Sequence, residues 1–226
     1  MRQFSISAIV IVSAGLLAPA VQAADLPIGG PSPYAVNEFV SNWYLRGDVG
    51  YQFSASSDSG GPPLTSSSYS DRPVLDFGVG YREGWVRGDL TVSWFEPQFT
   101  GSTALSSPDV SAKFDVIATL ANVYVDLGTW YGITPYVGGG IGFSWFHPSG
   151  FNANTLPNPV RGDTLDFSWD VTTGFSYAVS RQFLIDTSYR YLHAGTPKSN
   201  LGGFGTLDYG SMDAHELKTG FRYLID

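Results

Sequence analysis

The stretch WYLRGDVGYQF, residues 43–53, decides the fold because apolar and polar residues alternate along its whole length. One parity carries Trp, Leu, Val, Tyr and Phe, whereas the other carries Arg46, Asp48, Gly50 and Gln52. A period of two is typical of a β-strand with two unlike faces. The eleven residues of this stretch also match the length of a tilted transmembrane β-strand.

The same alternation recurs toward the C-terminus. It predicts further strands at 75–82, 86–94, 114–127, 137–145, 166–177, 183–191 and 216–223. Short connections at 83–84, 128–133 and 180–182 alternate with long polar ones at 55–72, 96–112, 147–163 and 193–213. This layout predicts an all-β fold, an eight-stranded antiparallel up-and-down transmembrane β-barrel with four long external loops and three short periplasmic turns.

The charged parity is expected to face the lumen. An Arg or Lys that faces lipid at the midplane costs about 2–4 kcal/mol, and a one-residue shift would turn Arg46 and Asp48 outward together. An eight-stranded barrel has room inside for side chains and little else. The sequence therefore predicts a lumen plugged by a polar network of Arg46, Asp48, Asp76, Arg82, Arg87, Asp89, Asp126, Asp166, Asp170, Asp186, Arg190, Glu216, Lys218 and Arg222.

The tryptophans divide between the two ends of the predicted strands. Trp43, Trp85 and Trp130 fall at the end with short turns, and Trp94, Trp145 and Trp169 fall at or near the end with long loops. Two belts of amphipathic rings are what two membrane–water interfaces require. A soluble lipocalin-like barrel, which also alternates, has no reason to divide its tryptophans in this way.

Composition excludes several classes of function. The 226 residues include 20 acidic and 12 basic ones, and a net charge of −8 argues against a nucleic-acid partner. The absence of cysteine excludes thiolate chemistry, zinc knuckles and disulfides. Nothing in the sequence indicates a cofactor, a metal site or a catalytic residue, and the three histidines are dispersed.

The N-terminus carries a targeting pattern. Arg2 is the only charge in the first 23 residues, and an apolar stretch and the small-residue site Val21-Gln22-Ala23 follow it. This is typical of a secretory signal peptide, so we expect cleavage between Ala23 and Ala24. The predicted parts are a signal peptide at 1–23, a periplasmic linker at 24–41 and an outer-membrane barrel at 42–226, with the mature chain located in the cell outer membrane.

Two motifs invite a catalytic or binding role. Residues 138–142, GGGIG, resemble a phosphate-binding loop, but no helix is expected to follow, so we interpret these glycines as relief of crowding inside the barrel. His215 and Glu216 beside Ser211 suggest a hydrolytic triad. Adjacent strand residues point to opposite faces, however, so Glu216 is not expected to hydrogen-bond to His215 and orient it as the base of a triad.

Three phrases carry a family resemblance: NVYVDLG at 122–128, TPYVGGGIG at 134–142 and SYRYL at 188–192, together with AADLP at 23–27. They are similar to phrases of small alphaproteobacterial outer-membrane proteins, the opacity-type surface antigen group with an OmpA/OmpX-like barrel. The resemblance covers residues 43–226 and implies a surface-exposed protein that supports envelope integrity, with no catalytic residues. Such barrels usually finish on an aromatic residue, whereas this chain ends in Asp226, so Tyr223 or Ile225 would have to serve in assembly.

The leading hypothesis is a non-enzymatic outer-membrane barrel with a structural and surface-interaction role. Its expected partners are outer-membrane lipid and lipopolysaccharide, the barrel assembly machinery and a surface ligand held by the long loops. The alternatives are a narrow channel for small solutes or ions, an outer-membrane lipid hydrolase and a soluble lipocalin-like carrier.

Overall fold

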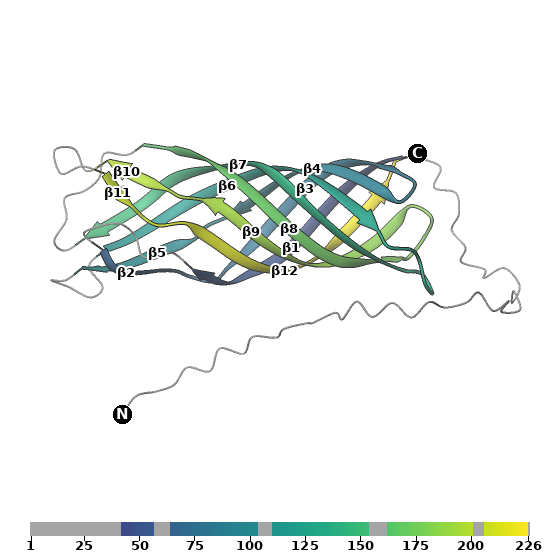
Figure 1. Ribbon diagram of the computed structural model, residues 1–226, viewed down its shortest axis with the longest axis horizontal. Helices are drawn as coiled ribbons and strands as arrows, with labels where there is room; N and C mark the ends of the chain where they lie inside the picture. Colours follow the sequence, from purple (N-terminus) through teal and green to yellow (C-terminus); the bar gives the residue numbers. More distant parts are fainter. Residues whose placement is uncertain (1–41, 57–63, 104–109, 154–161, 201–205, 226) are drawn as a thin grey trace, which may run out of the picture. The chain divides into compact units, whose positions relative to one another are not determined.

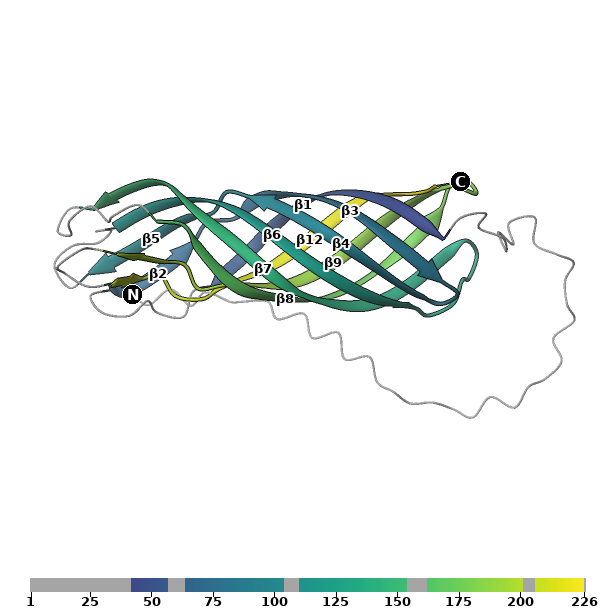
Figure 2. The same ribbon diagram turned by 90° about the horizontal axis from the view of Figure 1, so that it is seen from above.

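The computed structural model describes residues 42–56, 64–103, 110–153, 162–200 and 206–225. Eight long antiparallel strands form a closed barrel (Figures 1 and 2), with the order β1-β3-β4-β6-β7-β8-β9-β12 around the wall. Their bounds are β1 Trp43–Ser56, β3 Arg72–Glu83, β4 Val86–Phe95, β6 Val110–Asp126, β7 Ile133–Ala153, β8 Thr164–Ala178, β9 Phe183–Gly195 and β12 Met212–Leu224. The predicted eight-stranded antiparallel barrel is confirmed.

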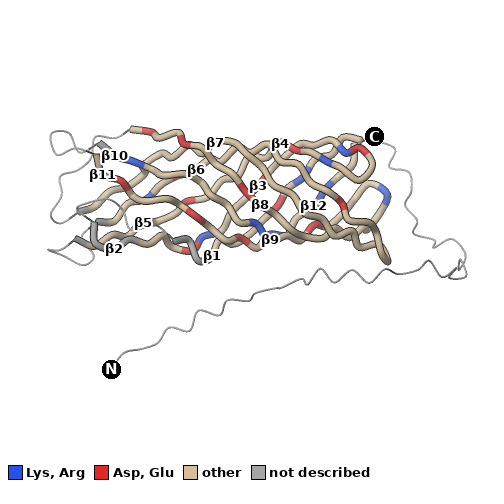
Figure 3. Tube along the Cα trace, viewed as in Figure 1, with Lys and Arg blue, Asp and Glu red and all other residues tan. Residues whose placement is uncertain are grey.

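Pairing between the first and last strands closes the wall. β1 and β12 are in register from Tyr44 opposite Leu224 to Phe53 opposite His215, so every long strand has two neighbours. The alternation read from residues 43–53 sets the facing: Leu45 and Val49 lie about half exposed on the outer side, whereas Arg46 and Asp48 are buried. Charged residues of both signs are interspersed along the wall (Figure 3).

The connections predicted as long loops contain more strand than expected. Four short strands lie within them: β2 Leu64–Tyr69, β5 Gln98–Thr103, β10 Lys198–Asn200 and β11 Thr206–Asp208. β7 also continues to Ala153, where its last residues pair with the start of β6. Polar Ser- and Thr-containing segments can pair as strands because the backbone supplies the hydrogen bonds. We call this side of the barrel the loop end and the opposite side the turn end (Figure 1).

The glycines of residues 138–142 lie inside β7 and not at a helix N-terminus. A β-carbon on Gly138 would collide with the Tyr124 ring, and one on Gly140 would collide with Asn122 Oδ1. Both glycines therefore let a large inward side chain of β6 lie against the wall of β7. This arrangement agrees with the crowding interpretation and leaves no phosphate-binding loop at these residues.

No helix in the part of the chain that the structure describes is long and apolar enough to cross a membrane. The predicted signal peptide with its Ala23–Ala24 cleavage site and the predicted linker at 24–41 lie outside the described residues.

Candidate functional site

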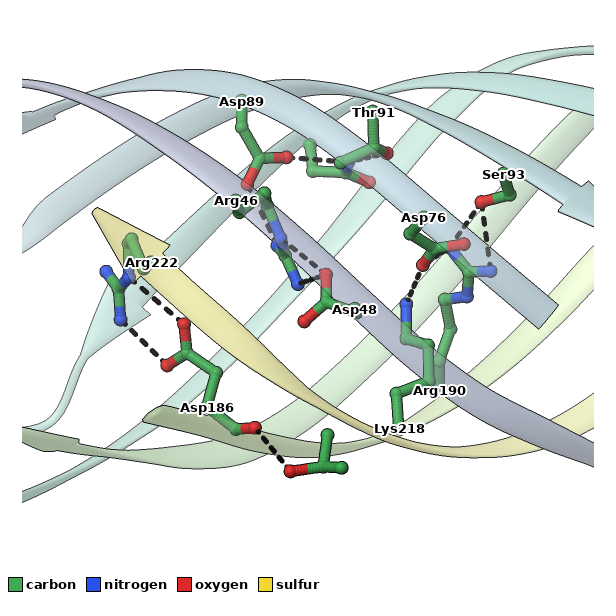
Figure 4. Close-up of polar contacts among 12 residues, drawn as sticks. Arg46, Asp48, Asp76, Asp89, Thr91, Ser93, Asp186, Arg190, Lys218 and Arg222 are labelled. Atoms are coloured by element: carbon green, nitrogen blue, oxygen red, sulfur yellow. Dashed lines mark hydrogen bonds and ion pairs between the residues drawn. The ribbon is translucent and has the colours of Figure 1, made fainter. Parts of the chain in front are cut away.

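The lumen near the turn end is filled by buried ion pairs. Arg46 lies between Asp48 at 2.8 Å and Asp89 at 2.9 Å, and it also donates to the Tyr124 hydroxyl at 3.0 Å. Figure 4 shows Arg46 between these two carboxylates. Because Arg46 comes from β1 and Tyr124 from β6, this contact crosses part of the lumen.

A second pair holds neighbouring strands together. Arg222 binds Asp186 through two guanidinium nitrogens, Nε at 3.1 Å and Nη2 at 2.9 Å (Figure 4), and Ser176 donates to the same carboxylate. Bidentate pairs of this kind have fixed geometry and strong hydrogen bonds. They satisfy charges that would otherwise be costly to bury.

Cation–π contacts between Arg87 and two tyrosine rings complete the turn half of the lumen. The Arg87 guanidinium lies 4.5 Å from the Tyr124 ring centre and 4.2 Å from that of Tyr136, and Arg87 also binds Asp126 at 3.1 Å. Arg82 lies 3.6 Å from the same carboxylate of Asp126. Cation–π contacts are strongest where water is excluded, so these tyrosines help to hold the arginines in place.

The middle of the lumen contains a second ionic cluster, centred on Arg190. Its guanidinium lies 2.5 Å from Glu216 and 3.4 Å from Asp76, and Lys218 binds Asp76 at 2.6 Å. Arg190 also donates to Ser93 at 3.2 Å (Figure 4). Ser93 belongs to β4 and Arg190 to β9, which are diametrically opposite in the strand order. One side chain therefore bridges the full width of the lumen.

Most of the predicted network lies in these two clusters. All of its members except Arg82 and Asp166 are buried. Arg82 is partly exposed at the turn end and keeps its pair with Asp126. Asp166 is partly buried and, among the described residues, accepts from the Thr196 backbone N–H at 2.7 Å and forms no ion pair. Asp166 is the third residue of β8, so it caps backbone near the loop end, beyond the ionic level.

Sequence reasoning missed a buried apolar cluster that fills the loop half of the lumen. Its rings pack edge to face: Phe114 lies 5.0 Å from Tyr209, and Phe99 lies 4.9 Å from the same ring. A signal was present, because residues 116–121 of β6 are apolar on both parities except for Thr119. The cluster, called here the apolar cap, comprises Tyr69, Val74, Phe95, Phe99, Ala112, Phe114, Val116, Ala118, Leu120, Phe146, Leu192, Ala194, Tyr209, Met212 and Ala214.

The outer surface carries exposed tryptophans toward both ends of the barrel. Trp43, Trp85 and Trp130 are more than half exposed toward the turn end, and Trp94 and Trp145 are 45% exposed toward the loop end. Trp169 is half-buried because it stacks on His193, with ring centres 5.8 Å apart. The tryptophans thus lie outside the barrel near both ends, and apolar side chains occupy the wall between them.

The residues of the suggested triad do not assemble. His215 lies on the outer face and bonds the Tyr189 hydroxyl, whereas Glu216 is buried in the lumen and accepts from Gln52 at 2.7 Å. Ser211 donates to Asp213 at 2.9 Å and not to a histidine. Within the described residues, no three His, Asp or Glu side chains have a geometry that could hold a metal ion.

Comparisons with known proteins agree with this architecture. Residues 11–223 match the outer membrane protein beta-barrel domain family. An uncharacterized protein of Brucella suis is 30% identical over 82% of this chain and 80% of its own. A putative adhesin of Rickettsia prowazekii is 25% identical over 82% of this chain and 88% of its own.

Solved structures show the same fold. Neisserial surface protein A superposes with a TM-score of 0.55 at 20% identity, covering 82% of this chain and 98% of its own. Outer membrane protein OprG of Pseudomonas aeruginosa gives a TM-score of 0.56 at 14% identity, covering 82% and 97%. With its eight-stranded wall, apolar exterior and charged interior, this chain belongs to the outer membrane β-barrel protein family and resides in the outer membrane.

Proposed function

We propose that this protein is a non-enzymatic outer-membrane barrel that acts through its loop end, as a surface-interaction protein of the adhesin kind. The observation that carries the proposal is that side chains fill the lumen at two levels. Arg190 bridges opposite walls to Ser93, and the apolar cap fills the half above it. A lumen filled in this way leaves the loop end as the part of the barrel that can meet a ligand.

The construction of the loop end supports this role. β2, β5 and the ends of β6 and β7 continue the wall as paired strands beyond the last outward tryptophans. The apolar cap supports them from inside through Phe99 and Phe114. Rigid strands that carry variable loops are a common way to present a binding surface. The relative from Rickettsia prowazekii is itself described as a putative adhesin.

A structural role in the envelope is the second part of the proposal. The apolar outer wall would bind outer-membrane lipid, including lipopolysaccharide. The barrel assembly machinery would recognise the last strand. Tyr223 is exposed on the outer face of β12 and paired with Leu45 and Phe183, so it offers this machinery an outward aromatic side chain on that strand.

Adherence of bacteria tests the surface role. The protein would be produced in a non-adherent Gram-negative host, and binding of the cells to cultured mammalian cells would be counted. We expect adherence to rise with the intact protein and to fall to the background when residues 154–161 and 201–205 are replaced by Gly-Ser linkers. Arg181→Gln at the turn end is the control, and a gel shift on boiling would verify folding in each case. Equal adherence with and without residues 154–161 and 201–205 would contradict the proposal.

Two measurements test the closed, non-catalytic barrel. Purified protein in planar bilayers should show no steady conductance, because both halves of the lumen are filled; a steady open level would favour the channel alternative. Purified protein should also leave lipopolysaccharide acyl chains intact. Deacylation that is lost in His215→Ala would instead establish a lipid hydrolase.

A further inference from the structure

Two cations near the loop end have no acidic partner among the residues that the structure describes. Most Arg and Lys side chains in the described ranges lie within 4.0 Å of a carboxylate oxygen, including Lys198 at the loop end. The exceptions among the described residues are Arg72, Lys113 and Arg181. Arg181 lies in the turn between β8 and β9, whereas Arg72 and Lys113 line one recess of about 80 Å³ at the opposite end.

Irregularities in neighbouring parts of the wall create this recess. β2 ends at Tyr69 before β3 begins at Arg72, and β4 and β5 are interrupted at Glu96 and Pro97. Where β6 pairs with β7, Ser149 of β7 is an extra residue between the partners of Lys113 and Phe114, which makes a bulge in β7. These breaks lie side by side because β5 pairs with both β2 and β6. The buried Phe114 contributes to the lining, together with Arg72, Glu96, Gln98, Lys113 and Ser149.

The recess contains several hydrogen-bond donors beside one carboxylate. Arg72 donates from Nε to Ser70 and from Nη2 to Gln98 Oε1, both at 3.0 Å. Because Oε1 of Gln98 accepts from Arg72, its amide Nε2 remains as a donor, and Lys113 lies directly opposite Gln98 in register. With Glu96 as the single carboxylate, the lining carries a net charge of +1. Such a site suits an anion with several acceptor oxygens.

The height of the recess places it at the membrane surface. Leu75, Trp94, Ile117 and Trp145 lie in register across four neighbouring strands and are exposed on the outer face. Tryptophans of this kind mark the membrane–water interface. Lys113 is four residues beyond Ile117, about 13 Å along the strand at 3.3 Å per residue. A group bound there would be at headgroup height, above acyl chains that cover the apolar row.

We propose that the recess binds a phosphate group of lipopolysaccharide in the surrounding outer leaflet. Phosphate oxygens can accept from the guanidinium N–H groups that Arg72 does not donate to Ser70 and Gln98, and from the ammonium of Lys113 on β6, which β4 and β5 separate from β3. Lys113 projects from the outer face of β6, since its neighbours Ala112 and Phe114 are both buried, and it shares the recess with the partly buried Arg72. The inference depends on the outer-membrane location of the family and not on the adhesin-like role, so failure of one leaves the other intact.

The test compares a recess variant with a charge-matched control. Arg72→Gln with Lys113→Gln removes both recess cations, whereas Arg181→Gln with Lys198→Gln removes two exposed cations elsewhere. Each purified protein would be titrated in detergent with lipopolysaccharide, with dephosphorylated lipopolysaccharide and with inorganic pyrophosphate, and the unfolding midpoint would be followed by gel shift. We expect intact lipopolysaccharide to raise the midpoint of the wild type and of the control, and to act at least ten-fold more weakly on the recess variant.

Three results would overturn the proposal. The first is a recess variant that responds to lipopolysaccharide as the wild type does. The second is an equal response of the wild type to dephosphorylated lipopolysaccharide, which would remove the phosphate from the recognition. The third is an equal response to pyrophosphate, which would make the ligand a soluble phosphate and not a lipid. If the double variant does not fold, Lys113→Gln alone against Lys198→Gln alone decides between the same outcomes.

Discussion

The two halves of the lumen are filled by opposite means. The turn half and the middle contain paired charges, whereas the loop half contains the apolar cap. The boundary crosses β9 between Arg190 and Leu192, which are successive inward residues, 2% and 0% exposed. The wall of the barrel shields both from lipid. The inward face is therefore defined by its isolation from the membrane and not by its polarity.

The largest loss of stability is expected when an ion pair of the ionic half is broken. Arg190→Met keeps a long side chain but removes the cation that pairs with the buried Glu216, whereas Asp76 keeps its pair with Lys218. Removing one partner of a buried pair typically costs about 3–5 kcal/mol, because the remaining charge stays buried and uncompensated. We expect a loss of this size in the free energy of unfolding, measured by equilibrium urea unfolding in lipid vesicles.

The control for this variant is Arg181→Met, which changes the same residue type at an exposed turn. Substitutions at such surface positions usually change stability by less than about 0.5 kcal/mol. If Arg190→Met were as mild as Arg181→Met, the ion pairs would contribute nothing to closing the lumen, and the comparison between the halves would fail.

In the apolar cap, a substitution by methionine should change the free energy of unfolding much less. Leu192→Met places methionine two residues further along β9, inside the apolar cap. Swaps between Leu and Met keep the volume and usually cost less than about 1.5 kcal/mol. The same urea unfolding measurement checks this value. A cost as large as that of Arg190→Met would mean that the cap requires one specific packing, as the ionic half requires its specific pairs.

The sequence was sufficient to predict the wall and the ionic half. Alternation along residues 43–53 predicted the facing of Arg46 and Asp48 correctly, because a charge that faces lipid is costly and the register has only two choices. The grouping of these charges into two clusters was not predictable. It depends on the stagger between strands, which brings Arg190 across to Ser93, 97 residues away in the chain.

The apolar cap was missed for a different reason. The prediction assumed that the more polar set of alternate residues in each strand faces inward. That assumption works only where one set is clearly polar, and Val116, Ala118 and Leu120 face inward although they are apolar. Tyr209 joins them from the segment before β12. The recess of Arg72 and Lys113 was missed because it arises from strand breaks, and a pattern of period two carries no information about where that period is interrupted.

The smallest effect is expected at the rim, where distance and burial can be separated. His147 Nδ1 lies 2.7 Å from Asp163 Oδ1, closer than Arg190 lies to Asp76 at 3.4 Å, yet the side chains of His147 and Asp163 are 59% and 40% exposed. Exposed pairs contribute between about 0 and 1 kcal/mol, because water screens the charges and the side chains lose entropy. His147→Ala should therefore change the free energy of unfolding by less than about 0.5 kcal/mol, as measured in the same urea titration. A loss of unfolding free energy near that of Arg190→Met would mean that the distance between the partners, and not their burial, sets the strength of these pairs. Burial of the ionic half of the lumen would then not explain why losing one of its pairs is costly.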